Sequence, residues 1–292
     1  MELWFMVAVS GAIAAGFSNF FFKIAAIRNY NAELFIFYSA LASVAVAIGL
    51  LVISPQQILG FGIITLILLV SGLISAAGGT LKVYALRYID STIYFPLFKL
   101  LTPALAIVAG VTFFAESFSY IEWFGLIIGL LVPLILITPA ENTRQQNLVM
   151  GLLLILVTSL ISAVTAIAGK YAIEAALPVL ITLLFTVIGL SLGSIILLLQ
   201  KRGLRGVSSL VMSESSVPLV QTAVTRAVLI SFGVWAMLFA YSAGGTLSVV
   251  QTIHSMYILI PIVLAVIFYN EHWNWQKAAA IGLSIVSLAF LG

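Results

Sequence analysis

Long apolar runs alternate with short polar breaks along the whole chain. The runs cover about residues 3–22, 34–53, 61–81, 92–114, 120–138, 148–169, 178–199, 218–241, 246–269 and 274–291. Each is close to the roughly 20 apolar residues that a helix needs to cross a bilayer. They are much longer than the strands of a membrane barrel, which take about 10 residues and alternate in polarity. The pattern predicts an all-α polytopic membrane protein with ten transmembrane helices.

Turn-forming and charged residues fill the breaks between the runs. Marked breaks occur at Arg28–Asn31, Ser54–Gln57, Arg87–Asp90, Pro139–Asn142 and Lys201–Gly203. The weakest break is Gly244-Gly245, which joins the eighth and ninth runs by very few residues. The ten runs and their short connections use up the chain, so we expect no separate soluble domain.

Composition supports a lipid-facing surface. The 292 residues are 63% hydrophobic and 7% charged, whereas a soluble domain carries about 25% charged residues. So few charges cannot cover a surface in water, and the lipid bilayer is the expected surrounding. The chain has no cysteine, which excludes disulfides and thiolate metal sites. Its 12 Lys and Arg against 9 Asp and Glu form no basic stripe, so no nucleic-acid partner is expected.

An internal repeat predicts how the helices are organised. The segment 114–120 resembles the segment 269–275, and the same offset of 155 positions aligns Lys99 with His254. We therefore expect two five-helix repeats, residues 1–140 and residues 148–292. An odd number of helices inserts the second repeat upside down relative to the first. Inverted repeats place a substrate site near the bilayer midplane, between two halves that rock for alternating access.

Several short motifs resemble a known family. Gly16-Phe17-Ser18-Asn19-Phe20 followed by Lys23 resembles the first-helix signature of EamA-type members of the drug/metabolite transporter superfamily. The same family resemblance extends to Pro103, Glu116, Gly125-x-x-x-Gly129, Glu271 and Gly282, with Pro261 about one turn later than the repeat predicts. The resemblance implies a ten-helix transporter of metabolites, amino acids, sugar phosphates or drugs, with helices of both halves around a central cavity.

Two cations lie far from any predicted helix end. Lys99 and Arg226 would each cost about 2.5–3.5 kcal/mol in lipid, so we expect both to face a polar interior. His254 lies at a similar depth by the repeat. All nine acidic residues lie at or near predicted helix ends. The interior therefore has cationic groups without carboxylates, which favours an anionic or zwitterionic small-molecule substrate.

Helical spacing extends the candidate substrate-binding site. Gln251 and Tyr257 share a face with His254, Asn19 follows Gly16 on the first helix, and Tyr94 and Trp235 are candidates for stacking on a substrate ring. Each residue also has a structural interpretation. The two cations could snorkel to the headgroups, His254 and Asn19 could bond neighbouring helices, and the aromatic residues could anchor the interface.

Other polar and small residues are assigned structural roles. Glu116 and Glu271 are expected to cap the helices that follow them, or to interact with their dipoles. Gly125 and Gly129 form a GxxxG motif for close helix packing or dimerisation, which leaves monomer and homodimer open. The chain has no HExxH motif, phosphate-binding loop or paired membrane acids. We therefore expect no catalytic residue, metal or cofactor.

Two arguments about orientation conflict. The loops after the odd-numbered helices contain the cations Arg28, Arg87, Arg144, Lys201, Arg202 and Arg205. The positive-inside rule places these loops in the cytoplasm and both termini outside, while the family resemblance implies cytoplasmic termini. The charge count is slightly favoured. In either orientation the multi-pass chain is expected in the plasma (inner) membrane.

The sequence as a whole predicts a secondary transporter or exchanger of a small organic anion or metabolite. One alternative is an exporter of neutral amino acids or aromatic drugs, in which the cations are peripheral. An alternative from another class is a membrane enzyme that acts on lipid phosphates, and a further one is a scaffold that transports nothing. The enzyme would need a nucleophile or metal carboxylates, which the predicted interior lacks.

Overall fold

The computed structural model describes residues 2–57, 62–89, 91–136, 148–260, 264 and 275–292, and these are helical with no strand among them. The helices are α1 (Leu3–Ile27), α2 (Ala32–Ile53), α3 (Ile63–Tyr88), α4 (Ser91–Phe113), α5 (Tyr120–Ile135), α6 (Leu148–Glu174), α7 (Val179–Glu214), α8 (Val217–Ser242), α9 (Leu247–Ser255), the 3₁₀ turn η1 (Met256–Ile258) and α11 (Trp275–Leu291). Each of the ten predicted runs that falls on described residues is helical there.

Side-chain caps fix where several helices begin. Asn31 accepts a hydrogen bond from the backbone N–H of Leu34 at the start of α2, and Ser216 does the same for Leu219 in α8. Ser119 and Glu122 form a reciprocal capping box on α5. Such caps satisfy backbone N–H groups that have no partner inside the helix. They lie in the polar breaks that the sequence marks as helix boundaries.

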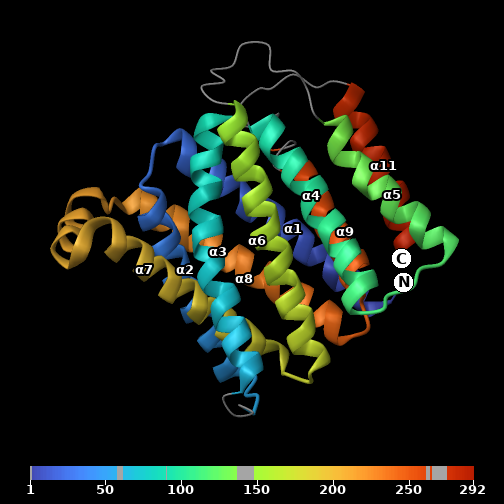
Figure 1. The fold of residues 1–292 in the computed structure, drawn as a ribbon, viewed down its shortest axis with the longest axis horizontal. Helices are drawn as coiled ribbons and strands as arrows, with labels where there is room; N and C mark the ends of the chain where they lie inside the picture. Colours follow the sequence, from blue (N-terminus) through green and yellow to red (C-terminus); the bar gives the residue numbers. More distant parts are fainter. Residues whose placement is uncertain (1, 58–61, 90, 137–147, 261–263, 265–274) are drawn as a thin grey trace.

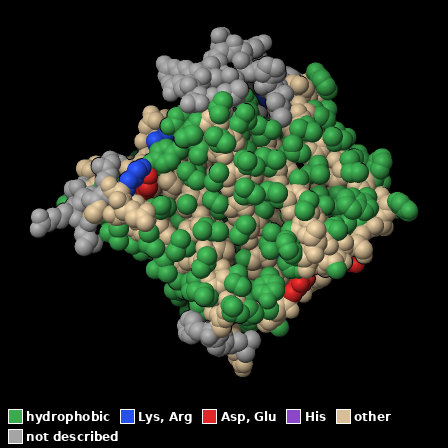
Figure 2. All heavy atoms as spheres, viewed as in Figure 1, with side chains coloured by type: hydrophobic (Ala, Val, Ile, Leu, Met, Phe, Trp, Pro, Cys, Tyr) green, Lys and Arg blue, Asp and Glu red, His purple; other side chains and the backbone are tan. Residues whose placement is uncertain are grey.

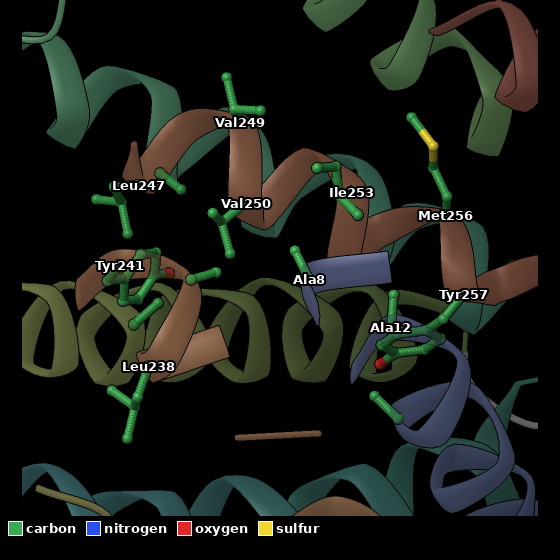
Figure 3. Packing of buried hydrophobic residues seen from close by; sticks show 14 of the residues in the cluster. Ala8, Ala12, Leu238, Tyr241, Leu247, Val249, Val250, Ile253, Met256 and Tyr257 are labelled. Carbon is green, nitrogen blue, oxygen red and sulfur yellow. The ribbon is translucent and has the colours of Figure 1, made fainter. Parts of the chain in front are cut away.

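The helices form a bundle in which segments far apart in sequence lie side by side (Figure 1). α1 packs along α8, α3 along α6 and α7, and α2 along α7 and α8. α4 packs against α6 and α9, and α5 packs against α11. Ala8 and Ala12 of α1, Leu238 of α8 and Ile253 of α9 belong to one apolar cluster (Figure 3). Helices from the start of the chain are therefore held by helices from its second half.

The outer surface has the character expected of a membrane-spanning bundle. Seven described helices are long and apolar enough to cross a membrane, and α5 and α11 are shorter apolar helices. Figure 2 shows a broad apolar face with the visible charged side chains at its edges. Exposed apolar side chains this numerous are stable in hydrocarbon and costly in water. The prediction of an all-α, multi-pass membrane protein is confirmed.

Two helices depart from the predicted runs. α7 continues to Glu214 beyond a break at Gly203, whose φ of 63° is left-handed and favours glycine. The run predicted at 246–269 is not one regular helix, because α9 ends at Ser255 and tightens into η1.

The GxxxG motif is used inside the chain. A Cβ added at Gly125 would lie 2.9 Å from Leu291 of α11, and one added at Gly129 would lie 2.5 Å from Thr252 of α9. Ser287 of α11 also donates a hydrogen bond of 2.7 Å to the carbonyl of Gly125. Of the two predicted uses, close helix packing is confirmed. The residues Asp90, Glu141, Arg144, Pro261 and Glu271 and the predicted join near 141–147 lie outside the described part of the chain.

A closer crossing joins α3 to α7. A Cβ at Gly72 would lie 2.1 Å from the carbonyl oxygen of Thr186, and a Cβ at Gly189 would lie 2.1 Å from the carbonyl oxygen of Leu69. The contact is reciprocal, with backbone against backbone at both positions. Any side chain larger than hydrogen would force the two helices apart.

Candidate functional site

Lys99 lies inside the bundle, as its sequence position predicts. Its side chain comes from α4 and is only 6% exposed. The Nζ atom lies 3.5 Å from the centre of the Tyr257 ring and 5.2 Å from that of Phe98. A cation over a ring face is stabilised by the ring quadrupole. The aromatic contacts therefore hold the ammonium group between α4 and η1.

Arg226 of α8 is likewise buried, with 9% exposure. Its guanidinium lies 4.2 Å from the ring centre of Phe22 in α1 and 5.9 Å from that of Phe35 in α2. The Nη1 atom donates a hydrogen bond to the hydroxyl of Ser39, while Nε has no partner. The expectation that Lys99 and Arg226 lie inside the protein is confirmed.

Lys82 of α3 is a third cation at the same place, which the sequence interpretation did not single out. Its Nζ lies 4.1 Å from the ring centre of Phe98 and 5.0 Å from that of Phe22. Its charge repels those of both Arg226 and Lys99. We call Lys82, Lys99 and Arg226, together with the rings of Phe22, Phe98 and Tyr257, the central cation cluster.

The cations of the central cation cluster lie well inside the ends of their helices. Lys82 is six residues before the end of α3, Lys99 eight residues after the start of α4, and Arg226 nine residues after the start of α8. At about 1.5 Å per residue, these positions are about 9–14 Å from the helix ends. Each cation is therefore more than one helical turn from the nearest end of its helix.

No carboxylate among the described residues contacts the central cation cluster. Described acids are engaged elsewhere: Glu2 with Trp4, Glu33 with Tyr84 and Lys201, Glu116 with Leu247 and Ser248, Glu122 with Ser119, and Glu174 with Lys170. Buried charges are normally paired because desolvation is costly. In the described part of the protein, the cluster is therefore a concentration of positive charge with hydrogen-bond donors to spare.

His254 lies beside the cluster at the crossing of α1 and α8. Its ring meets that of Tyr257 edge to face at 6.2 Å, and its Nε2 has no hydrogen-bond partner. A Cβ added at Gly11 of α1 would lie 3.5 Å from this nitrogen and 3.2 Å from the carbonyl oxygen of Gly233 in α8. The two glycines let the helices approach closely around the imidazole. The structure thus brings His254 together with Lys99 through Tyr257.

Asn19 and Tyr94 lie at the margins of the cluster. Asn19 is one turn before Phe22 on α1; its Nδ2 donates to the carbonyl of Ala15 at 2.7 Å, and its Oδ1 is buried without a partner. The close approach expected near it is made by η1, since a Cβ at Gly16 would lie 3.0 Å from the carbonyl oxygen of Tyr257. Tyr94 stacks on Phe98 and shares a hydrogen bond of 3.0 Å with Thr158 of α6.

Gln251 and Trp235 lie away from the cluster. Gln251 donates to the hydroxyl of Tyr241 at 2.9 Å and also contacts the sulfur of Met237, so it faces α8. Trp235 is stacked between Phe232 and Phe239 on one side of α8, and Phe232 is exposed. This ladder has the character of a lipid-facing surface. Trp235 is therefore not placed to contact a ligand bound at the cluster.

Comparison with known proteins gives these features a context. Residues 2–138 match the EamA-like transporter family. The match spans the N-terminal part of the chain, from α1 to the end of α5. A solved crystal structure has 15% sequence identity and a TM-score of 0.72, covering 98% of this chain and 95% of its own, which shows a shared fold across both halves. No curated protein matches the sequence.

The family match confirms the resemblance seen in the sequence motifs. The match to a transporter family indicates a membrane transporter of small molecules, whose partners would be the lipid bilayer and a small-molecule substrate. EamA is a family of transporters and not of enzymes.

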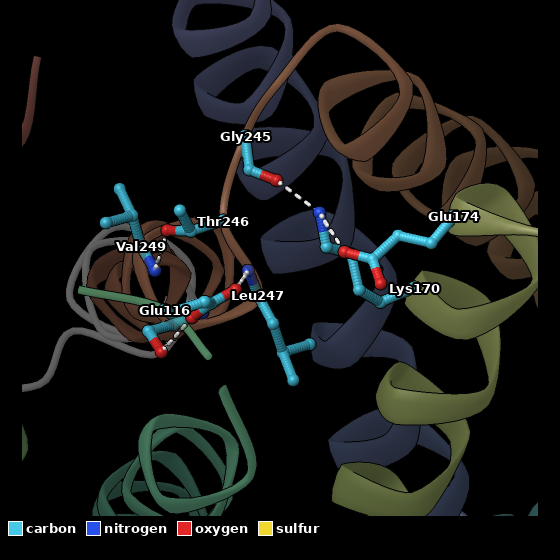
Figure 4. A network of polar contacts seen from close by, with 8 residues as sticks. Glu116, Lys170, Glu174, Gly245, Thr246, Leu247 and Val249 are labelled. Atoms are coloured by element: carbon cyan, nitrogen blue, oxygen red, sulfur yellow. Dashed lines mark hydrogen bonds and ion pairs between the residues drawn. The ribbon is translucent and has the colours of Figure 1, made fainter. Parts of the chain in front are cut away.

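At one end of the bundle, polar contacts tie the first and second halves of the chain together (Figure 4). The carboxylate of Glu116, in the α4–α5 loop, accepts hydrogen bonds from the backbone N–H groups of Leu247 and Ser248 and from the Ser248 hydroxyl. Glu116 therefore caps a helix, as predicted, but the helix is α9 and not α5. The loop turns back at Ala115, which has a positive φ. This directs the carboxylate toward the second half.

Lys170 completes the contacts at this end, which we call the Glu116 end. Its Nζ donates to the carbonyl of Gly245 at 3.1 Å and pairs with Glu174 at 3.3 Å. Gly245 belongs to the turn that the sequence marks as the weakest break, and Gly244 beside it has a φ of 100°. The turn between α8 and α9 is thus held from α6.

We expect Glu116→Gln to loosen the start of α9. An amide oxygen accepts more weakly than a carboxylate, and hydrogen bonds to charged groups contribute about 1.5–3 kcal/mol. The measurement is thermal unfolding in detergent, with a double-mutant cycle against Ser248→Ala to isolate the shared contact. Glu122→Gln is the control, because Glu122 caps only its own helix at the surface. Equal destabilisation by both glutamine variants would contradict a special role for Glu116.

The opposite end carries a second polar network, which we call the Glu33 end. Glu33 at the start of α2 accepts hydrogen bonds from Lys201 of α7 and from the hydroxyl of Tyr84 of α3, the latter at 2.6 Å. Lys201 also donates to Tyr84 at 2.7 Å. A cavity of about 230 Å³ beside it is lined by Glu33, Leu197, Gln200 and Lys201. Both ends of the bundle therefore carry polar contacts between helices of its first and second halves.

Proposed function

We propose that this EamA-like protein is a secondary transporter that moves a small organic anion across the membrane by alternating access. The observation that carries the proposal is the central cation cluster, in which buried Lys99 and Arg226 have no carboxylate partner among the described residues. An anionic group on a substrate would supply the missing charge and the missing acceptors. His254 and Asn19, each with a buried polar atom lacking a partner, are the proposed orienting residues.

The proposed architecture is ten transmembrane helices in two inverted repeats, residues 1–140 and 148–292. The packing pairs support it. The proposed repeat makes five pairs of equivalent helices: α1 and α6, α2 and α7, α3 and α8, α4 and α9, and α5 and α11. Exchanging each helix for its equivalent converts the α1–α8 pair into the α3–α6 pair. It likewise converts the α2–α8 pair into the α3–α7 pair. It also converts the α1–α9 pair into the α4–α6 pair, and all six pairs are packed. Such exchange symmetry is what inverted repeats produce.

The two polar ends supply the gates for alternating access. Contacts at the Glu116 end join the α4–α5 loop and α6 to the α8–α9 turn, and contacts at the Glu33 end join α2 and α3 to α7. Opening the cluster to either side of the membrane requires one of these networks to separate while the other holds. Arg28, Arg87 and Lys201 lie at the Glu33 end, so the positive-inside rule favours this end as the cytoplasmic one in the plasma (inner) membrane.

The test is substrate counterflow in proteoliposomes. A panel of phosphorylated sugars, carboxylates, neutral amino acids and cationic dyes is offered to the wild-type protein and to Lys99→Ala. We expect saturable flux of an anion that the substitution abolishes. Flux of neutral amino acids or aromatic compounds that survives Lys99→Ala would reject the anion site and favour the exporter alternative. Lys201→Ala, which removes a cation outside the cluster, separates loss of charge at the site from loss of a gate contact.

A further inference from the structure

The central cation cluster has more positive charge than a monoanion can neutralise. Lys82, Lys99 and Arg226 converge from α3, α4 and α8, and their charges repel one another. When all three side chains are protonated, a monoanion would leave two positive charges together inside the bundle, and a dianion would leave one. In an interior of low dielectric constant this difference is large, because each uncompensated charge interacts strongly with its neighbours.

The cluster also has hydrogen-bond donors that lack acceptors. Lys82 and Lys99 are held by ring faces, which occupy their charge without accepting conventional hydrogen bonds. Arg226 gives only Nη1 to Ser39, and its Nε is buried without an acceptor. A ligand with several acceptor oxygens at one or both ends would satisfy these donors. Dicarboxylates and phosphate monoesters share this chemistry.

Nothing described in the protein already neutralises Lys82. Glu33 is the buried acid of the neighbouring helix, but it is bonded to Lys201 and Tyr84. Tyr84 is two residues from Lys82 on α3, and residues at this spacing do not share a helix face. Lys82 instead points to Phe22 and Phe98, the rings that it shares with Arg226 and Lys99. Its ammonium group therefore belongs to the cluster and not to the Glu33 end.

We propose that the transported anion carries two negative charges, and that Lys82 is the residue that selects the second charge. This inference rests on the proposed function and narrows it to a substrate class. Arg226 and Lys99 bind the anion in any case, and Lys82 distinguishes a dianion from a monoanion of the same shape. Dicarboxylates and phosphate monoesters are the two candidate sources of this charge.

The test compares dianions with their singly charged derivatives in the counterflow assay. The probes are succinate against its monomethyl ester, and a phosphate monoester against its methyl diester. We expect the wild-type protein to prefer the dianion of at least one pair by about tenfold or more, a factor that corresponds to about 1.4 kcal/mol. Lys82→Gln should remove this preference by slowing the dianion while leaving the monoanion within about twofold. The pair that shows the preference identifies the source of the charge.

Two further variants guard against trivial explanations. Lys82→Arg keeps the charge and should restore the preference, which a merely structural role for the lysine side chain would not require. Arg87→Gln removes an exposed cation from the same helix, where it donates to the carbonyl of Tyr30, and should leave the preference unchanged. A second readout is pH. Phosphate monoesters gain their second charge near pH 6, so wild-type uptake should rise across that pH and Lys82→Gln uptake should rise less.

The outcomes that overturn the inference differ from those that overturn the proposed function. Equal transport of both members of each pair by the wild-type protein, or an equal loss of both in Lys82→Gln, would refute selection of a dianion while leaving anion transport intact. Absence of any anion flux, with flux of neutral or cationic compounds, would refute both proposals.

Discussion

Arg226→Gln is expected to reduce anion counterflow by about a hundredfold or more, which corresponds to about 2.7 kcal/mol. Glutamine keeps much of the side-chain length but has no charge and no planar fork of donors. The guanidinium contacts Phe22 and Phe35 and bonds Ser39, so α1, α2 and α8 all position it. Removing a fixed cation from an interior of low dielectric constant costs more than removing one from the surface.

The measurement is the initial rate of counterflow at equal protein density in the liposomes. Arg226→Lys is the matched comparison, since it keeps the charge and loses the fork, and it should retain an intermediate rate. Lys277→Gln is the control, because Lys277 lies on α11, a helix that belongs neither to the cluster nor to either polar network, and it should remain near the wild-type rate. A rate for Arg226→Gln within about threefold of wild type would show that the cation is structural and does not touch the substrate.

Gly189→Ala is expected to have the largest effect on folding. Its new methyl group would meet the carbonyl carbon and oxygen of Leu69, with the nearest contact at 2.1 Å. Neither helix can relieve this by rotating a side chain, because the obstacle is backbone. Overpacking of this kind costs about 1–3 kcal/mol and more when the backbone must shift. Gly72→Ala, on the other side of the crossing, should behave alike.

The readout is the yield of monodisperse protein in detergent and its thermal unfolding temperature. Gly49→Ala is the control, because a Cβ at Gly49 in α2 meets nothing within 4 Å. Alanine there should be neutral or slightly stabilising, since it favours the helix. The double variant of Gly72 and Gly189 should cost less than the sum of the single variants, because the first separation relieves the second clash. Wild-type stability for Gly189→Ala would contradict the close crossing.

The helices could be predicted from sequence because an apolar run long enough to cross lipid must also satisfy its own backbone hydrogen bonds, and a helix does so. The predicted ends were less accurate, and α3 shows why. Its apolar run ends near residue 81, but the helix continues to Tyr88 through aromatic and charged residues. Hydropathy marks where lipid begins and ends, whereas a helix continues into the interface as long as its backbone bonds are made.

The same difference explains why Lys82 was missed. A run that ends near residue 81 places Lys82 at a helix end, where a lysine is ordinarily an interfacial residue. The longer helix places it more than a turn inside. Lys99 and Arg226 were identified because they lie far from any boundary, so an error of several residues did not matter. The distance of a cation from a predicted helix end is therefore informative only where it exceeds the error in the predicted end.

Partners across the bundle could not be derived from spacing. Gln251 and His254 share a face of α9 by periodicity. In the structure, however, Gln251 bonds Tyr241 of α8, whereas the His254 ring contacts Tyr257. The GxxxG of α5 predicted a close neighbour without naming it, and the neighbour proved to be α11. Glu116 caps a helix, as predicted, but not the helix that follows it in sequence. The capped helix is α9, which starts at Leu247, whereas α5 starts at Tyr120. Such pairings depend on tertiary structure.

The interleaving of the two halves has a consequence for how the chain is made. α1 finds its main partner in α8, which begins only at Val217. A ribosome that has delivered α1 to the bilayer must therefore continue well into the second half of the chain before the main partner of α1 is made, although α7 becomes available to cover α2 earlier. During that interval Asn19 and the glycine faces of α1 are open to lipid or to the insertion machinery. Translation arrested before Val217 should leave a nascent chain whose first helices are inserted, unassembled and readily recognised by membrane proteases.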